Sequence, residues 1–236
     1  MMKSEPARRA FVRVAAVSML YSVSCAVGLL GGLAGGGGEA LGSTRNRDAE
    51  QFVERNATTA LEALGDRSTN KTHMRETFGS LMIEFADVPR ISTFVLGAYA
   101  LGIRRDPSLA REWGDAFRAY TVANYADRLQ VYAGHAVRAT GSIERVPDQD
   151  VVVRTEIPRE ASQPPRVVQW RMLRAGSGWK VADIAVVLDG NEIWLAQQQK
   201  SQFSSILDRN NGDVRALIAS LRQTTATLEA HARATP

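Results

Sequence analysis

Along residues 48–133 the apolar side chains recur at steps of three and four, which is the spacing of amphipathic helices. Gly65 ends the first of these patterns, while Asp87 and Pro89 provide a cap and a first-turn proline for the third. The third pattern carries few charges, so we expect its helix to be largely buried. The pattern therefore predicts four helices, over residues 48–63, 71–85, 89–103 and 107–133.

The fourth predicted helix changes its apolar spacing part-way along. From Leu109 to Tyr120 the apolar steps are four, four and three, and the pattern restarts only at Tyr125, after a gap of five. A straight helix with one buried stripe does not produce such a gap. We therefore expect either a bend near residues 121–124 or a rotation of the buried face, before Gly134 closes the helix.

After Gly134 the apolar period shortens to two residues, which predicts β-strands. Short turn clusters separate the strands, and short links favour an antiparallel meander. Val168, Trp170 and Met172 alternate with polar residues, so one face of the sheet is expected to be buried. The predicted strands cover residues 135–143, 151–157, 166–173 and 179–188, and helical spacing returns over 195–207 and 214–221. Helices, a meander and further helices describe an α+β fold.

The N-terminal residues differ in pattern from the rest of the chain. A positively charged stretch precedes an uncharged apolar segment over residues 14–34, which is the pattern of an export signal. Small residues up to Gly42 predict cleavage after that position, while an uncharged, mostly apolar segment of 21 residues is also long enough for an uncleaved anchor. We expect an exported protein with a signal peptide or anchor over residues 1–42 and one domain over 43–236.

Composition and charge refine this picture and exclude several classes of protein. A chain of 236 residues that is 44% hydrophobic and 23% charged is typical of a globular domain and not of a disordered one. The net charge of +4 falls to +2 without residues 1–42, which is too little to indicate a nucleic-acid partner. Cys25, the single cysteine, lies in the N-terminal segment, so the predicted domain has no disulfide, cysteine-ligated zinc or cysteine nucleophile.

The sequence contains none of the catalytic motifs that would indicate an enzyme: no HExxH, no phosphate-binding loop and no GxSxG. His73, His135 and His231 lack a second histidine at ligand spacing, and we assign them to the polar surface. Asp183 interrupts the apolar strand pattern, and three interpretations are open for it: a solvated side chain, a partner for backbone groups, or the general base of a pocket. We predict no metal, no cofactor and no assigned catalytic residue.

Several short segments occur in order along the chain: DVPRI at 87–91, FVLG at 94–97, YAG at 132–134, GWKV at 178–181 with Asp183, and KSQF at 200–203. Together they resemble the MlaC family of periplasmic phospholipid-binding proteins, first named for toluene tolerance. Over roughly residues 48–223 they occur in the family's order, and a sister branch, the hopanoid-associated HpnM proteins, shares the pattern. Residues 191–194 depart from the small hydroxylated residues that are common there in the family.

The resemblance implies a curved four-stranded antiparallel sheet covered by helices, a cone like that of nuclear transport factors, with a lipid cavity. It implies a periplasmic carrier that shelters phospholipid acyl chains and shuttles them between an outer-membrane lipoprotein complex and an inner-membrane ABC transporter with an MCE-domain subunit. That transport maintains outer-membrane lipid asymmetry. The alternatives are a carrier of hopanoids or other terpenoid lipids, an enzyme that uses the pocket, and a structural adaptor. Nucleic acid is not an implied partner.

Apolar residues in excess of what a small core needs are candidates for the cavity wall. Plain core packing explains each of them equally well, because periodicity indicates burial and not empty space. Arginines at positions 90, 104, 105, 166, 171 and 174 could lie at a polar mouth or on a solvated face, and we assign no phosphate ligand. The predicted lipid-binding residues are Phe78, Met82, Phe85, Phe94, Val95, Tyr99, Phe117, Tyr120, Val168, Trp170 and Met172.

Overall fold

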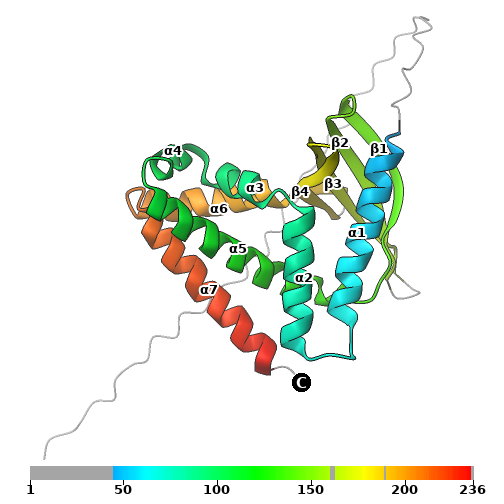
Figure 1. Cartoon of the computed structure of the whole chain (residues 1–236), viewed down its shortest axis with the longest axis horizontal. Coiled ribbons are helices and arrows are strands. Elements are labelled where there is room, and N and C mark those ends of the chain that lie inside the picture. Colours follow the sequence, from blue (N-terminus) through cyan, green and yellow to red (C-terminus); the bar gives the residue numbers. More distant parts are fainter. Residues whose placement is uncertain (1–44, 160–162, 189, 235–236) are drawn as a thin grey trace, which may run out of the picture. The chain divides into compact units, whose positions relative to one another are not determined.

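A computed structural model describes residues 45–159, 163–188 and 190–234, and these form helices around one antiparallel sheet (Figure 1). The predicted signal segment, residues 1–42 with Cys25, lies outside the described residues. The helices are α1 (Arg47–Gly65), α2 (Lys71–Phe85), α3 (Val88–Leu96), α4 (Ala100–Ile103), α5 (Pro107–Leu129), α6 (Leu195–Arg209) and α7 (Val214–Ala234). The strands are β1 (Arg138–Val146), β2 (Asp150–Ile157), β3 (Arg166–Ala175), β4 (Gly178–Leu188) and β5 (Asn191–Trp194).

The sheet is an antiparallel meander in the order β1-β2-β3-β4-β5, which confirms the predicted topology and the α+β fold. The predicted strand count was wrong, because the described residues contain five strands and not four. Residues Asn191–Trp194, which depart from the family pattern, pair with Ala185–Leu188 of β4. Asn191 and Glu192 are exposed polar residues, so this short edge strand has no apolar alternation for a sequence pattern to detect.

A β-bulge in β4 explains why Asp183 interrupts the apolar pattern. Arg171 of β3 pairs with Asp183 and Met172 pairs with Val181, which leaves Ala182 as an extra residue. One extra residue reverses the side-chain alternation, because side chains in a strand have a period of two. Val181 and Ile184 therefore lie on the same buried face of the sheet although three positions separate them.

The predicted third helix, residues 89–103, is in fact interrupted. It divides into α3, a 3₁₀ turn over Gly97–Tyr99 and the short α4. The break lies at Gly97, whose φ of +57° is a conformation that L side chains rarely adopt. The segment is also less buried than predicted, because Phe94 is 38% exposed and Leu101 is 64% exposed.

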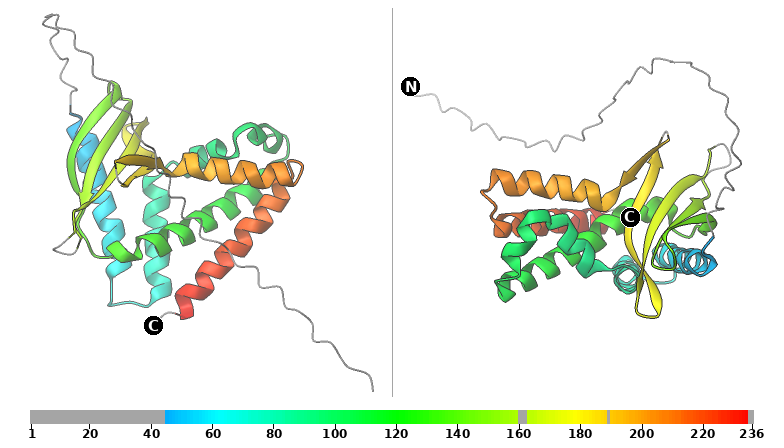
Figure 2. Two further views of the ribbon diagram at one scale, coloured as in Figure 1. Left: turned by 180° about the vertical axis from the view of Figure 1, so that it is seen from behind. Right: turned by 90° about the horizontal axis from the view of Figure 1, so that it is seen from above.

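Helix α5 is continuous over the residues where its apolar spacing changes. Trp113 and Phe117 belong to an apolar cluster shared with α3, α6 and α7, whereas Ala126 belongs to a second cluster against α1, α2 and the sheet. The gap in the pattern thus marks the point where the helix passes from one cluster to the other, in agreement with a rotated buried face. Figure 1 shows α5 and α7 lying side by side, and Figure 2 shows the same pair from two further directions.

Helices α1 and α2 cover one face of the sheet, and a polar network fixes the start of α1 to β1. Arg45 donates two hydrogen bonds to the buried Glu50, at 2.9 and 2.7 Å. Ser142 of β1 donates to Glu50 Oε1 at 2.7 Å and accepts from the backbone N–H of Asn46 at 2.8 Å. The Asn46 side chain in turn caps α1 by accepting from Ala49 N at 3.0 Å.

This network makes the stability of the fold depend on pH. The hydrogen bonds from Arg45, with that from Ser142, hold the pKa of Glu50 below its ordinary value of 4.5. A lowered pKa in the folded state contributes stability above the ordinary value, and this stability is lost as the pH falls through the lowered value. We expect the Glu50→Gln variant to be less stable than the wild type near neutral pH, and the difference to shrink below pH 4.5. Urea unfolding followed by circular dichroism measures it, and a difference that is independent of pH would contradict the assignment.

Candidate functional site

A cavity of about 240 Å³ lies between the sheet and the helices that cover it. Strands β2, β3 and β4 form one wall, and α1, α2 and α5 form most of the other, with single turns of α3 and α6 at one end. The surface inside it is almost entirely apolar. Its volume is slightly below the range of about 300–1,000 Å³ that is common for small-molecule sites.

Six of the eleven predicted lipid-binding residues line this cavity. They are Phe78, Met82 and Phe85 on α2, Phe117 on α5, and Val168 and Trp170 on β3. A hydrogen bond fixes the Trp170 ring, because its Nε1 donates to the buried Thr155 Oγ1 at 2.8 Å. Thr155 Oγ1 is itself held by the Val168 carbonyl oxygen at 3.2 Å. The sheet wall is therefore a fixed apolar surface, and the part these residues take in lipid binding stays a prediction.

The other five predicted residues lie away from the cavity: Phe94, Val95, Tyr99, Tyr120 and Met172. Val95 and Met172 have no exposed surface and pack inside apolar clusters. The Tyr120 ring packs against Phe203, with ring centroids 6.0 Å apart. These three residues have the same apolar periodicity as the cavity residues, but their side chains pack against other side chains and do not line the cavity.

Phe94 and Tyr99 lie on the outer side of α3 and on the turn that follows it. The Lys200 ammonium lies 5.0 Å from the centroid of the Phe94 ring, a cation–π contact. The Tyr99 hydroxyl donates to Asp208 Oδ1 at 2.7 Å, and this bond raises the pKa of Tyr99. Both side chains join α3 and its turn to α6 and do not face the cavity.

The contribution of α1 and β4 to the cavity wall was not predicted from the sequence. Helix α1 provides Val53, Ala57 and Leu61, and β4 provides Ile184 and Val186. Alanines on the buried stripe of α1 were a usable signal, because a small side chain on an apolar stripe leaves space beneath it. The residues of β4 were hidden by the bulge, which breaks the alternation expected of a strand.

A few polar groups on β4 and α5 line the cavity. Asp183 Oδ1 accepts from the backbone N–H groups of Ile184 at 2.8 Å and of Ala196, in the first turn of α6, at 2.9 Å. The backbone-partner interpretation of Asp183 is therefore confirmed, while its role as a base stays a hypothesis. Burial raises the pKa of Asp183, and burial also raises that of the neighbouring Tyr125. Thr121 Oγ1 is buried without a hydrogen-bond partner among the described residues.

Two arginines lie among the lining residues, and one of them marks the mouth. Arg128, in the last turn of α5, is the only exposed residue among those that line the cavity, and we take this position as the cavity mouth. Arg166, the first residue of β3, is half-buried at the same cavity. Arg166 is among the arginines that the sequence suggests for a polar mouth. Arg128 is not among them, because an arginine on a long helix resembles any solvated side chain.

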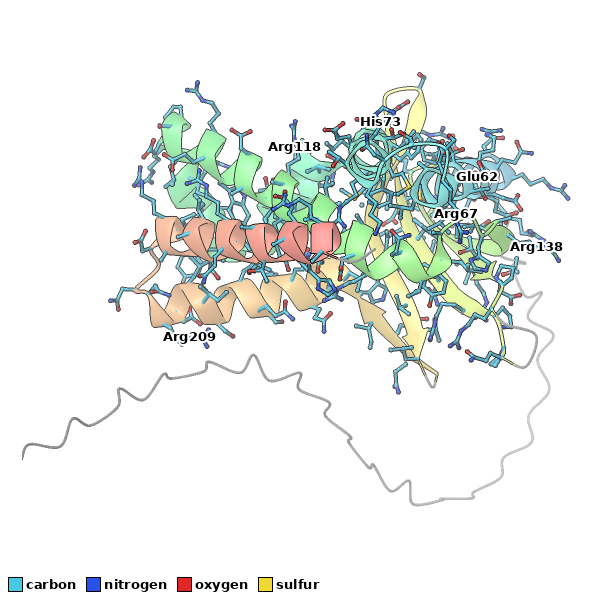
Figure 3. All side chains as sticks on the ribbon, turned by 90° about the horizontal axis from the view of Figure 1, so that it is seen from below. Glu62, Arg67, His73, Arg118, Arg138 and Arg209 are labelled. Atoms are coloured by element: carbon cyan, nitrogen blue, oxygen red, sulfur yellow. The ribbon has the colours of Figure 1, made fainter. Side chains whose placement is uncertain are left out.

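No group of three or more His, Cys, Asp or Glu side chains capable of holding a metal ion occurs in the described part of the chain. His73 lies on the outer side of α2 and its Nδ1 is 3.9 Å from Glu76 (Figure 3). None of the described helices is both long enough and apolar enough to span a membrane.

Comparison with known families identifies the chain. The family profile described as MlaC protein matches residues 54–223, which include most of α1, all five strands and the first half of α7. The chain belongs to the MlaC family. This confirms the resemblance in the sequence, and the matched region contains almost the whole cavity wall.

The solved structures add a likeness of fold to this MlaC assignment. A phospholipid-binding protein from Ralstonia solanacearum, whose structure is in complex with a phospholipid, matches with a TM-score of 0.65 and 24% sequence identity. The match covers 77% of this chain and 99% of that protein. A search of curated proteins found no match. At this identity the likeness establishes a shared fold, an open antiparallel sheet covered by helices.

Proposed function

We propose that this MlaC-family protein is a lipid carrier whose cavity shelters the acyl chains of a phospholipid. The observation that supports this proposal most directly is the almost wholly apolar cavity with charged side chains at its rim. Membership of the MlaC family supports it, and so does the related fold of the Ralstonia solanacearum protein, which is described in complex with a phospholipid. Because the lining has almost no polar surface, acyl chain would enter the cavity and the polar part of the lipid would stay at the mouth.

Simple energetics explain why such a protein needs no catalytic group. Each methylene moved from an apolar environment into water costs about 0.8 kcal/mol, so the roughly thirty methylenes of two acyl chains represent on the order of 20 kcal/mol. A lipid therefore leaves a bilayer extremely slowly without help. A carrier reduces this cost by providing a dry apolar surface, and the rate gain comes from binding alone.

We also propose where this carrier works and with which partners. The protein works in the periplasm and moves phospholipid between an outer-membrane lipoprotein complex and an inner-membrane ABC transporter complex that has an MCE-domain subunit. This transport maintains the lipid asymmetry of the outer membrane. The positively charged and then apolar pattern of residues 1–42 supports export, and the family membership supports the two partners.

Extraction of the purified protein tests the carrier function. The protein is produced in a bacterial host, purified without detergent and extracted with organic solvent, and the extract is identified by mass spectrometry. We expect phospholipid to accompany the protein and to be taken up again from phospholipid vesicles after removal. A protein that carries no lipid and takes none from vesicles contradicts the proposal. Recovery of a polycyclic terpenoid lipid in place of phospholipid would favour the HpnM-type alternative.

A further inference from the structure

The mouth of the cavity brings together two cationic side chains from distant parts of the sequence. Arg128 lies in the last turn of α5 and Arg166 at the start of β3, and both line the cavity. Tyr132 connects them: it lies four residues after Arg128, and its hydroxyl accepts a hydrogen bond from Arg166 Nε at 3.2 Å. This hydrogen bond places the start of β3 beside the turn that follows α5, and from it we infer that the two guanidinium groups lie at the same end of the cavity.

Both guanidinium groups are held by their inner nitrogen. Arg128 Nε donates to Asn124 Oδ1 at 3.1 Å, as Arg166 Nε does to the Tyr132 hydroxyl. The terminal nitrogens of these two arginines donate to no described residue. A guanidinium fixed at Nε presents its two terminal N–H groups as a fork, and this fork matches two oxygens of a phosphate.

Neither arginine forms an ion pair with a carboxylate of the described residues. Other arginines near the sheet do: Arg171 lies 2.8 Å from Asp150, and Arg174 pairs with Asp148. The carboxylate that lines the same cavity, Asp183, is bonded to backbone N–H groups, and Arg171 is the arginine that lowers its pKa. The charge of the two rim arginines is therefore available to a ligand.

Helix α5 also presents a gradient from apolar to cationic along the cavity. Phe117, fully buried, is followed on the lining face by Thr121, Tyr125 and the exposed Arg128. Eleven residues of helix correspond to about 16 Å. An elongated ligand with an anionic end at Arg128 would place its apolar part against Tyr125, Thr121 and finally Phe117.

We propose that Arg128 and Arg166 form a phosphate-binding site at the cavity mouth and select lipids that carry a phosphate group. This inference rests on the proposed function, since the acyl chains of that lipid would occupy the cavity. Binding of acyl chains requires apolar surface and no charge, so the phosphate site gives these two charged side chains a function of their own. The role of each arginine is to bind the head group, and the apolar wall retains its separate role toward the chains.

A matched pair of lipids tests the phosphate site. Delipidated protein is given an equimolar mixture of dioleoyl phosphatidic acid and dioleoylglycerol in non-ionic detergent, and bound lipid is quantified by mass spectrometry after gel filtration. The two lipids have the same acyl chains and differ in the phosphate. We expect the wild type to favour phosphatidic acid, each single change, Arg128→Gln or Arg166→Gln, to reduce the preference about tenfold, and the double change about a hundredfold.

Two arginines outside the cavity provide controls. Arg118 on α5 and Arg138 at the start of β1 are exposed and do not line the cavity (Figure 3). We expect Arg118→Gln and Arg138→Gln to keep the wild-type preference. Urea unfolding checks that Arg128→Gln is folded, because a cation in the last turn of a helix also interacts with the carbonyl groups there.

The outcomes separate the phosphate site from the carrier function. The site is supported if the wild type and the double variant bind dioleoylglycerol equally and only the double variant loses the preference for phosphatidic acid. A folded double variant that keeps its preference overturns it, even if both lipids bind. A wild type that binds neither lipid contradicts the carrier function itself. Inorganic phosphate is added as a further competitor, and we expect it not to displace phosphatidic acid. Displacement by inorganic phosphate alone would show that the site binds free phosphate and not the head group of a lipid.

Discussion

Substitution of Ala57 by phenylalanine is expected to weaken lipid retention about a hundredfold. Ala57 lies on α1, is 9% exposed and lines the cavity, so a larger side chain there extends into the space between α1 and the sheet. A phenyl ring displaces roughly four methylenes of an acyl chain, and at about 0.8 kcal/mol each this corresponds to about 3 kcal/mol. The measurement is the amount of phospholipid retained after purification, together with the rate of uptake from vesicles.

The Ala57 prediction requires a control for surface effects and one for folding. Ala219→Phe places the same ring on the exposed side of α7, away from the cavity, and we expect it to retain lipid as the wild type does. Ala60→Phe fills the same cavity from the next position of α1 that lines it, so it repeats the test if Ala57→Phe folds poorly. Full lipid retention by both folded cavity variants would show that the acyl chains do not occupy this cavity.

Replacement of Phe203 by alanine is expected to lower the free energy of unfolding by about 4 kcal/mol. Phe203 of α6 is 2% exposed. Its ring centroid lies 6.0 Å from that of Trp113, 6.4 Å from that of Phe117 and 6.0 Å from that of Tyr120, and all three contacts are edge-on. Truncation therefore removes a buried ring from the cluster that joins α6 to α5. Urea denaturation followed by tryptophan fluorescence and circular dichroism measures the loss.

A second phenylalanine on the helical side of the molecule provides the comparison. Phe94 of α3 is 38% exposed and has Lys200 above its ring, so Phe94→Ala is expected to cost less than about 1 kcal/mol. Similar losses for Phe203→Ala and Phe94→Ala would contradict the assignment of Phe203 to the central aromatic cluster. Because Phe203 does not line the cavity, the lipid bound per folded molecule is expected to be unchanged in Phe203→Ala.

The elements of the fold were predictable because their patterns are local. Helix α2 covers residues 71–85, as the apolar spacing predicts, and the meander follows from four alternating segments with short links. The features that were missed depend on pairing. The edge strand Asn191–Trp194 exists because β4 offers it a partner, and the bulge at Ala182 is a matter of register between β3 and β4.

The candidate site was predictable only in part, for a related reason. Phe78 and Val95 both lie on the buried face of a helix, and only the first adjoins the cavity. The presence of Arg128 and Arg166 in one cavity lining depends on the contact between the turn that follows α5 and the start of β3, which lie far apart in the sequence. No pattern along the chain encodes that proximity.

The amino-acid sequence by itself determined the α+β class, the MlaC family and most of the side chains that leave water. Burial is predictable to that extent because it follows from the period of apolar residues along each element. The tertiary structure decided which of those side chains face a cavity and which face other side chains. That distinction depends on how far apart the helices and the sheet lie and on the register in which they pack. The proposed roles of Ala57, of the shifted alternation in β4 and of the two rim arginines depend on this packing. They arise only where helices and strands that are separate in the sequence come into contact.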